Sequence, residues 1–228
     1  MWLGSYGPAA LLTIRVGTGS IQQDFVAHES FLISRSGFFR RAVNGSWEES
    51  ETRIVKLPED SPKIFALYID CAYTNQISSD SVERNPPAKA ENNTKENIDL
   101  LKAEIWDLVH VYILAEKLLD GTTKNIVIET LFKLFHLRDT PLRPIEGMIK
   151  EVYRNTPETS PLRRFLVDLR LDYASAKLRK EIDGLPKEYL LDLAIALQAR
   201  ATGINEVAKQ NGVGVYLQVA AQEREEGA

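Results

Sequence analysis

The residue types that could carry catalysis or bind a metal are sparse along this chain. It has one cysteine, Cys71, and three histidines, His28, His110 and His136. No histidine stands at ligand spacing from another histidine or from the cysteine, so no zinc site is expected. A single cysteine excludes an intramolecular disulfide framework, and the sequence has no Gly-x-Ser-x-Gly elbow. The sequence therefore predicts a protein that is not an enzyme, with no catalytic residues, no metal and no cofactor.

Several short features that could be taken for chemical sites have a simpler structural interpretation. Gly17-Thr18-Gly19 is glycine-rich, but no Gly-Lys-Ser/Thr follows and the chain continues into a β-like run. A hairpin turn is therefore favoured over a phosphate loop. The acidic pair Glu59-Asp60 precedes a predicted helix, where negative charge complements the helix dipole. His28 and His110 are interpreted as structural histidines, and Cys71 as a small buried hydrophobic residue.

One stretch is unusual enough to indicate a binding role. Trp47 is followed by the acidic turn Glu48-Glu49-Ser50-Glu51, directly after an apolar helical pattern. An aromatic side chain ringed by polar groups is the usual form of a binding hot spot. Alternatively, the ring of Trp47 packs locally on the helix of Phe38 and Phe39, and the glutamates face water. The residues by themselves leave both interpretations open.

Composition limits the classes of partner. The chain has 228 residues, 44% of them apolar and 26% charged, and a net charge of −4. Nucleic-acid surfaces need clustered Lys and Arg, so no direct nucleic-acid binding is expected. The N-terminus lacks the pattern of a signal peptide, and no apolar run reaches the ~18 residues of a membrane span. We therefore expect a soluble intracellular protein, in the cytoplasm, the nucleus or both, with no membrane contact.

Periodicity predicts strands and helices in the first 137 residues. Leu11–Val16 alternates as a half-buried strand does, a second strand contains Phe25 and Val26, and a third covers 53–57. Helices are expected over 28–35, 36–43, 61–75, 100–119 and 123–137. The predicted fold class is α+β, a small β-sheet flanked by helices.

The remaining segments are predicted to be a flexible insertion and an all-helical extension. Residues 78–97 contain one branched aliphatic residue and no aromatic residue, too little apolar area to offset the entropy of ordering. Beyond Pro144, helices are expected over 145–154, from Pro161 and from Pro186, the last with Gly203 as its stop. In this last helix Leu190, Leu193, Ala194 and Leu197 are predicted to face inward.

The first half of the chain resembles a known family. The segments "FVAHESFLISRSGFFRRAVNGSWEES" and "IVKLPEDSPKIFALYIDCAYTNQI" resemble a BTB/POZ domain, most closely its short fungal versions. The resemblance extends over roughly 10–139, with residues 100–137 similar to the closing helical hairpin of the family. It implies a BTB/POZ domain over 10–139 that contains the 78–97 insertion, followed by a helical C-terminal extension over 140–228.

The resemblance implies a role in protein–protein interaction. BTB/POZ domains commonly form homodimers, and many act as scaffolds or adaptors that link a substrate to a cullin-type ubiquitin ligase. In such adaptors a hydrophobic residue, any residue and then glutamate contact the cullin. Trp47 and Glu49 match this motif, and Phe39 is a third candidate contact residue.

The alternative function is a transcriptional or chromatin-associated regulator that acts through BTB-mediated dimerisation. Family members often carry an acidic residue just before the first strand, and Ala10-Leu11 stands there. The resemblance therefore leaves open whether this chain forms the homodimer of the family or one that is built differently.

Overall fold

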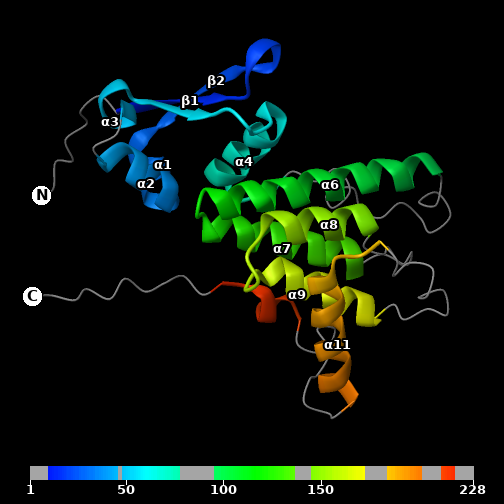
Figure 1. The fold of residues 1–228 in the computed structure, drawn as a ribbon. Coiled ribbons are helices and arrows are strands. Elements are labelled where there is room, and N and C mark those ends of the chain that lie inside the picture. Colours follow the sequence, from blue (N-terminus) through cyan, green and yellow to red (C-terminus); the bar gives the residue numbers. More distant parts are fainter. Residues whose placement is uncertain are drawn as a thin grey trace, which may run out of the picture.

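The computed structural model describes residues 10–45, 48–77, 95–136, 145–172, 184–201 and 212–218. Figure 1 shows a small sheet with a few short helices at one end of the molecule and a stack of longer helices at the other. The sheet and its helices come from the first 77 residues, and the stack comes from the rest of the described chain. The α+β fold class predicted from periodicity is confirmed.

The sheet has three strands among the described residues, β1 (Leu11–Val16), β2 (Gln23–His28) and β3 (Ile54–Leu57), in the order β2-β1-β3. β1 pairs with β2 antiparallel and with β3 parallel. Alternate residues of β1 are fully buried, namely Leu12, Ile14 and Val16. Because strand side chains point alternately to opposite faces, one face of the sheet lies on the core and the other is left to solvent. The predicted hairpin is confirmed: a 3-10 turn, η1 (Gly19–Ile21), joins β1 to β2.

Three helices cover the inner face of the sheet: α1 (Glu29–Arg35), α2 (Gly37–Asn44) and α4 (Pro62–Thr74). The side chain of Ser36 caps α2 by accepting a hydrogen bond from the N–H of Phe39 at 3.2 Å. Ser61 stands at the N-cap of α4, but its side chain makes no such bond. The start of this helix is instead favoured by Pro62, whose fixed φ suits the first helical position. Each of these helices lies within about a turn of its predicted range.

The longest described helix, α6 (Lys95–Lys117), runs antiparallel to α7 (Gly121–His136), with a two-residue turn and Asp120 between them. The sequence predicted that this helix starts at residue 100, after a flexible insertion that was predicted to end at residue 97. In the structure the last three residues of that segment, 95–97, are already helical. Two of these three residues are lysine and glutamate, which are good helix formers, and this explains why a polar stretch can open the helix. The rest of the segment, 78–94, lies outside the described residues.

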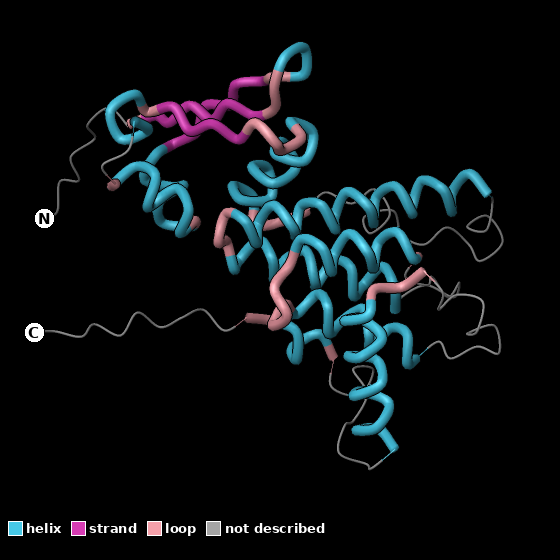
Figure 2. Tube along the Cα trace, viewed as in Figure 1, coloured by secondary structure: helices cyan, strands magenta, loops and turns pink. Residues whose placement is uncertain are grey.

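The C-terminal part is helical in its described residues, with α8 (Glu146–Asn155), α9 (Pro161–Asp172), α11 (Lys187–Ala201) and a final 3-10 turn, η2 (Val213–Tyr216). Figure 2 shows this part without strands. In α11 the inward face was predicted wrongly in part. Leu193 is buried, but Ala194 and Leu197 are exposed, and the inward position is taken by the fully buried Tyr189.

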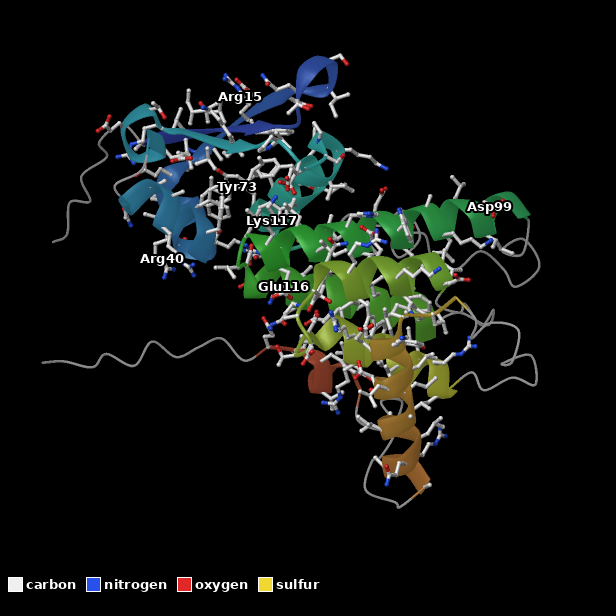
Figure 3. The ribbon with its side chains drawn as sticks, viewed as in Figure 1. Arg15, Arg40, Tyr73, Asp99, Glu116 and Lys117 are labelled. Atoms are coloured by element: carbon white, nitrogen blue, oxygen red, sulfur yellow. The ribbon has the colours of Figure 1, made fainter. Side chains whose placement is uncertain are left out.

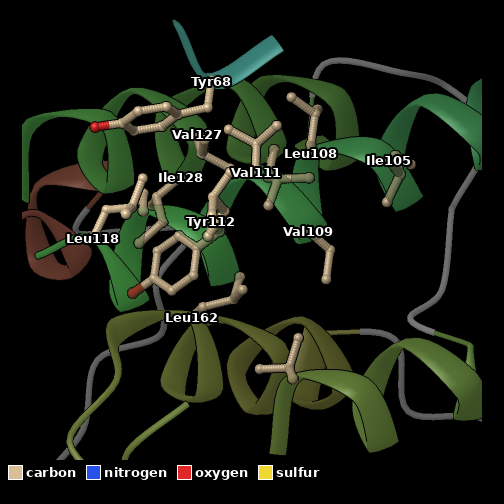
Figure 4. Close-up of a cluster of buried hydrophobic side chains, with 14 of the residues drawn as sticks. Tyr68, Ile105, Leu108, Val109, Val111, Tyr112, Leu118, Val127, Ile128 and Leu162 are labelled. Atoms are coloured by element: carbon tan, nitrogen blue, oxygen red, sulfur yellow. The ribbon is translucent and has the colours of Figure 1, made fainter. Parts of the chain in front are cut away.

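One continuous core joins the two ends of the molecule. Tyr112 of α6 packs with Leu162 of α9 in the cluster drawn in Figure 4, and Tyr68 of α4 enters the same cluster from the sheet side. The Tyr112 hydroxyl lies 3.1 Å from Ser160 Oγ just before α9. The division into 10–139 and 140–228 stays a prediction, because apolar contacts pass across it. Within the described residues, no helix combines the length and the apolar character that a membrane crossing requires.

Candidate protein-interaction site

The acidic segment after α2 forms a short helix. The sequence predicted a solvated turn, but Glu48–Thr52 is helical and is labelled α3 in Figure 1. Figure 1 also shows that α3 lies beside the sheet and α2, at the end of the molecule away from α8, α9 and α11. None of the described C-terminal helices therefore covers this segment.

The junction between α3 and β3 depends on Arg53. Its N–H donates to the carbonyl of Glu49 at 3.0 Å, and its φ of 54° places it in the left-handed region. A left-handed residue that closes the last turn is the common way to end a helix, although glycine is the usual choice. The carbonyl of Arg53 in turn accepts the N–H of Thr13 at 3.0 Å. The end of α3 is thus held directly by the first strand.

The residues predicted to contact a partner differ in their placement. Glu49 is half-buried in α3, and Trp47 lies outside the described residues. Phe39 has 0% of its surface exposed and belongs to the core between α2 and the sheet. Its assignment as a contact residue is therefore corrected, because a fully buried ring has no surface to offer a partner. The periodicity of α2 could have shown this, since Phe39 and Val43 share the inward face.

The N-terminus of α2 is anchored on the turn between α6 and α7. The buried hydroxyl of Ser36 donates to the carbonyl of Leu118 at 2.5 Å, and the N–H groups of Gly37 and Phe38 donate to the carbonyls of Leu119 and Leu118. These bonds join segments about 80 residues apart in the sequence. They fix α2, and with it the acidic segment, on the helical stack.

A buried ionic network fixes the same junction. Arg35 Nε of α1 donates to Asp120 Oδ2 at 2.9 Å, and Arg35 also donates to Asn75 Oδ1 at 2.6 Å. Asp120 is fully buried and accepts from the Thr123 N–H at 2.9 Å and from the Tyr68 hydroxyl at 3.2 Å. Burial, followed by the nearby Asp120 carboxylate, raises the pKa of Tyr68 above its ordinary range, so this hydroxyl stays a donor.

Sequence reasoning missed this network. The predicted helices over 100–119 and 123–137 left Asp120 between them without a role, whereas Asp120 is the N-cap of α7, a role for which aspartate is a preferred residue. This N-cap role of Asp120 could have been predicted from the sequence. Arg35 and Tyr68 could not have been assigned, because nothing in their local patterns relates them to position 120.

The remaining candidate chemical residues have structural surroundings. His28 Nδ1 lies 3.0 Å from the Tyr73 hydroxyl, and His110 Nδ1 lies 2.8 Å from the carbonyl of Trp106. Cys71 is buried as predicted, and burial raises the pKa of its thiol to about 11. Within the described ranges, no three His, Cys, Asp or Glu side chains are grouped to hold a metal ion. The side chain of His136 lies outside the described residues.

Comparison with protein families agrees with this architecture. The family model of the BTB/POZ domain matches residues 12–120. The match begins in β1 and ends at Asp120, so it contains the sheet, the acidic segment and α6. α7 and the C-terminal helices lie beyond it. The resemblance found in the sequence is therefore confirmed over these residues, and residues 12–120 of this chain form a BTB/POZ domain.

Proposed function

We propose that this chain is a non-catalytic adaptor whose BTB/POZ domain docks on a cullin-type ubiquitin-ligase scaffold through Trp47 and Glu49. BTB/POZ domains are in general protein-interaction modules, and the proposal specifies one partner class for this one. It acts in the cytoplasm or the nucleus, where it needs neither a cofactor nor direct contact with nucleic acid.

The observation that carries the proposal is the position of α3. This helix lies at the periphery of the domain, and no described C-terminal helix covers it (Figure 1). Its C-terminus is fixed by Arg53, so Glu49 is presented in a defined orientation. A pre-positioned contact residue loses less side-chain freedom on binding than a mobile one, which favours affinity. An acidic helix with a tryptophan before it has the composition of a docking element.

The substrate-binding part is assigned to the C-terminal helices. α8 and α9 pack on α6 and α7, and α11 packs on α8 and α9, at the end of the molecule opposite α3 (Figure 1). Both ends could therefore be occupied at once. α11 exposes Leu191, Ile195 and Leu197, and exposed apolar side chains are common at sites of protein contact. The adaptor would therefore hold scaffold and substrate on separate surfaces.

The test is an affinity pull-down from an extract of the native host, with mass spectrometry. The full chain is compared with Trp47→Ala/Glu49→Ala, and circular dichroism checks that both are folded. Glu51→Ala is the matched control, because Glu51 is an exposed acidic residue of the same helix outside the proposed motif. A cullin captured by the wild type and by Glu51→Ala, but lost with the double variant, supports the proposal.

Two results would contradict the adaptor function. The first is the absence of any cullin from the wild-type eluate, and the second is a cullin retained equally by the double variant. In either case the co-purifying proteins decide whether the chain is a scaffold or a regulator of transcription or chromatin that acts through dimerisation.

A further inference from the structure

Residues 212–218 form a short strap on the surface of α7 and α9. Figure 1 shows this strap in red beside α9. It contains the 3-10 turn η2, and after the turn the backbone of Leu217 is extended, with φ −78° and ψ 135°. Tyr216 is the one fully buried side chain of the strap, with 1% of its surface exposed. The strap therefore depends mainly on a single aromatic residue for its attachment.

The surface under the strap is built to hold a tyrosine. The ring of Tyr216 packs edge-on against Phe165 of α9, with 5.3 Å between the ring centres. Its hydroxyl donates to Asp168 Oδ2 at 2.8 Å. An aromatic ring buried at one end and hydrogen-bonded at the other is a common anchor of bound peptides and proteins. The carboxylate of Asp168 accepts a proton that tyrosine has and phenylalanine lacks, so the surface distinguishes the two.

A second contact recognises the backbone of the strap. Asn125 Nδ2 donates to the carbonyl of Gln218 at 2.8 Å, and Asn125 Oδ1 accepts the N–H of Gln218 at 2.8 Å. Both bonds go to main-chain groups, so they do not depend on which side chain stands at this position. The position excludes only proline, which has no backbone N–H. Asn125 thus recognises the residue two positions after the tyrosine by its main chain.

Other contacts fix the elements that carry these residues. Asn125 lies in the first turns of α7, which Asp120 caps, and next to it Lys124 Nζ donates to Glu116 Oε1 at 3.0 Å. Figure 3 shows Glu116 near the end of α6 that turns into α7. α9 is held by α8 and α11 on one side and by α7 through Phe165 on the other. The site is therefore positioned independently of the strap, as a binding site needs to be.

We propose that Asn125, Phe165 and Asp168 form a peptide-binding site that the strap occupies until a partner displaces it. The ligand is an extended segment of another protein, in which a tyrosine is followed two positions later by any residue except proline. It takes over the hydrogen bonds that Tyr216 and Gln218 make in the strap. The strap is the element that yields, because segments with few buried side chains open at the lowest cost in free energy.

The site lies on α7 and α9, away from α3 (Figure 1). Peptide binding is therefore independent of the proposed cullin contact. The identification of the ligand as the substrate of the adaptor does rest on the proposed function, and it names the class of substrate that the C-terminal helices would select.

The test measures binding of a capped, fluorescent peptide of residues 212–218 by fluorescence anisotropy. The receptor is the full chain with Tyr216→Ala, in which the strap loses its anchor. We expect saturable binding, and at least ~10-fold weaker apparent binding to the wild type, where the tethered strap competes at a high effective concentration. Adding Asn125→Ala should raise the Kd at least ~10-fold, because two hydrogen bonds are lost. Asn155→Ala is the matched control and should change it by less than about 2-fold, since Asn155 is an exposed asparagine of α8.

Two changes in the peptide test the recognition of its backbone. Gln218→Pro removes the N–H that Asn125 accepts and should abolish binding, whereas Gln218→Ala keeps it and should bind like the original peptide. Loss of affinity with both peptides would mean that the site recognises the glutamine side chain, which contradicts the proposal.

A label on the strap extends the test to a chain that retains Tyr216. Gly214 is exposed, and a Cβ there meets nothing within 4 Å. Because Cys71 is buried, a fluorophore attaches selectively to the variant Gly214→Cys. Excess unlabelled peptide should release the strap and lower the anisotropy of this label, and the Gln218→Pro peptide should not.

Three results would overturn the proposal. They are the absence of strap release by the peptide, equal affinity of the wild type and Tyr216→Ala for it, and binding that Asn125→Ala leaves unchanged. Each concerns α7 and α9 alone. The capture of a cullin through Trp47 and Glu49 is measured separately, so the failure of one proposal is distinguished from the failure of the other.

Discussion

Two arginine–aspartate pairs in this chain have nearly the same shortest N–O distance and opposite surroundings. Arg35 Nε lies 2.9 Å from Asp120 Oδ2 where α1 meets the α6–α7 turn, and Arg15 Nε lies 2.8 Å from Asp24 Oδ1 on the sheet. The side chains of the first pair are 9% and 0% exposed, and those of the second are 36% and 41% exposed. Distance alone would rank the two pairs as equal, whereas burial separates their roles.

The fold depends on the buried pair, whereas the exposed pair mainly sets the charge of the surface. Removing one member of a buried pair leaves an uncompensated charge in a medium of low dielectric constant. An exposed pair gains little, because water and salt screen it and ordering two long side chains costs entropy. Asp120 therefore positions the helices that carry the acidic segment, while Asp24 shapes the charge of the β2 edge.

The largest difference between the two regions should appear when each aspartate is removed. Asp120→Ala leaves Arg35 buried without its carboxylate and removes the N-cap of α7. We expect a loss of about 3–5 kcal/mol in the free energy of unfolding, measured by urea denaturation. Asp24→Ala is the matched control and should move the denaturation midpoint hardly at all. Similar losses of unfolding free energy in both variants would show that burial does not separate the roles of the two pairs.

A smaller effect is expected inside the buried network. Tyr68→Phe deletes one donor to Asp120 and leaves the bonds from Arg35 and Thr123 in place. The expected cost is about 1 kcal/mol, the net value of a typical hydrogen bond. A cost as large as that of Asp120→Ala would mean that the hydroxyl, and not the ion pair, organises the junction.

Cys71 reports on the same junction through its reactivity. Burial raises the pKa of its thiol to about 11, and an unfolded thiol titrates near ~8.5. Because the folded pKa is raised, the stability that this thiol contributes is complete below pH ~8.5 and is lost as the pH rises toward about 11. At pH 8 we expect native alkylation at least ~100-fold slower than in denaturant, and faster in Asp120→Ala than in the wild type. Equal native rates in the two proteins would contradict a loosened junction.

The smallest effect is expected for acid titration of the exposed pair. The hydrogen bond from Arg15 lowers the pKa of Asp24. A lowered pKa contributes stability above the unfolded value, and this is lost as the pH falls through the folded value. Because both side chains are well exposed, solvent screens nearly all of it. Denaturation of Asp24→Asn between pH 2.5 and pH 5 should therefore follow the wild type, and a clearly flatter pH profile would show that the pair stabilises the fold.

Sequence patterns were most reliable where a local rule decides the structure. The strand Leu11–Val16 was predicted to the residue, because alternation is preserved when one face is buried. The start of α4 at Pro62 follows from proline at the first helical turn. The burial of Cys71 was also predicted correctly, from the apolar helical pattern around it.

Local rules were less reliable where two faces of one helix are both apolar. In α11 the leucines at 190, 191, 193 and 197 do not define a single stripe, and only packing against α8 and α9 selects Tyr189 and Leu193 for burial. The same limit applies to Phe39, which was proposed as a contact residue and belongs to the core. An aromatic residue fits either environment, and its pattern alone does not decide between them.

The sequence by itself determined the small sheet, the BTB/POZ domain of residues 12–120 and the scarcity of catalytic residue types, because each depends on spacing or on residue identity. Only the tertiary structure decided which aspartate is buried, which strands lie at the two edges of the sheet in the described residues, and where α3 lies relative to the C-terminal helices. Asp24 and Asp120 are the same residue type 96 positions apart. Whether water reaches each one depends on segments far away in the sequence, and this decides the energy of its ion pair.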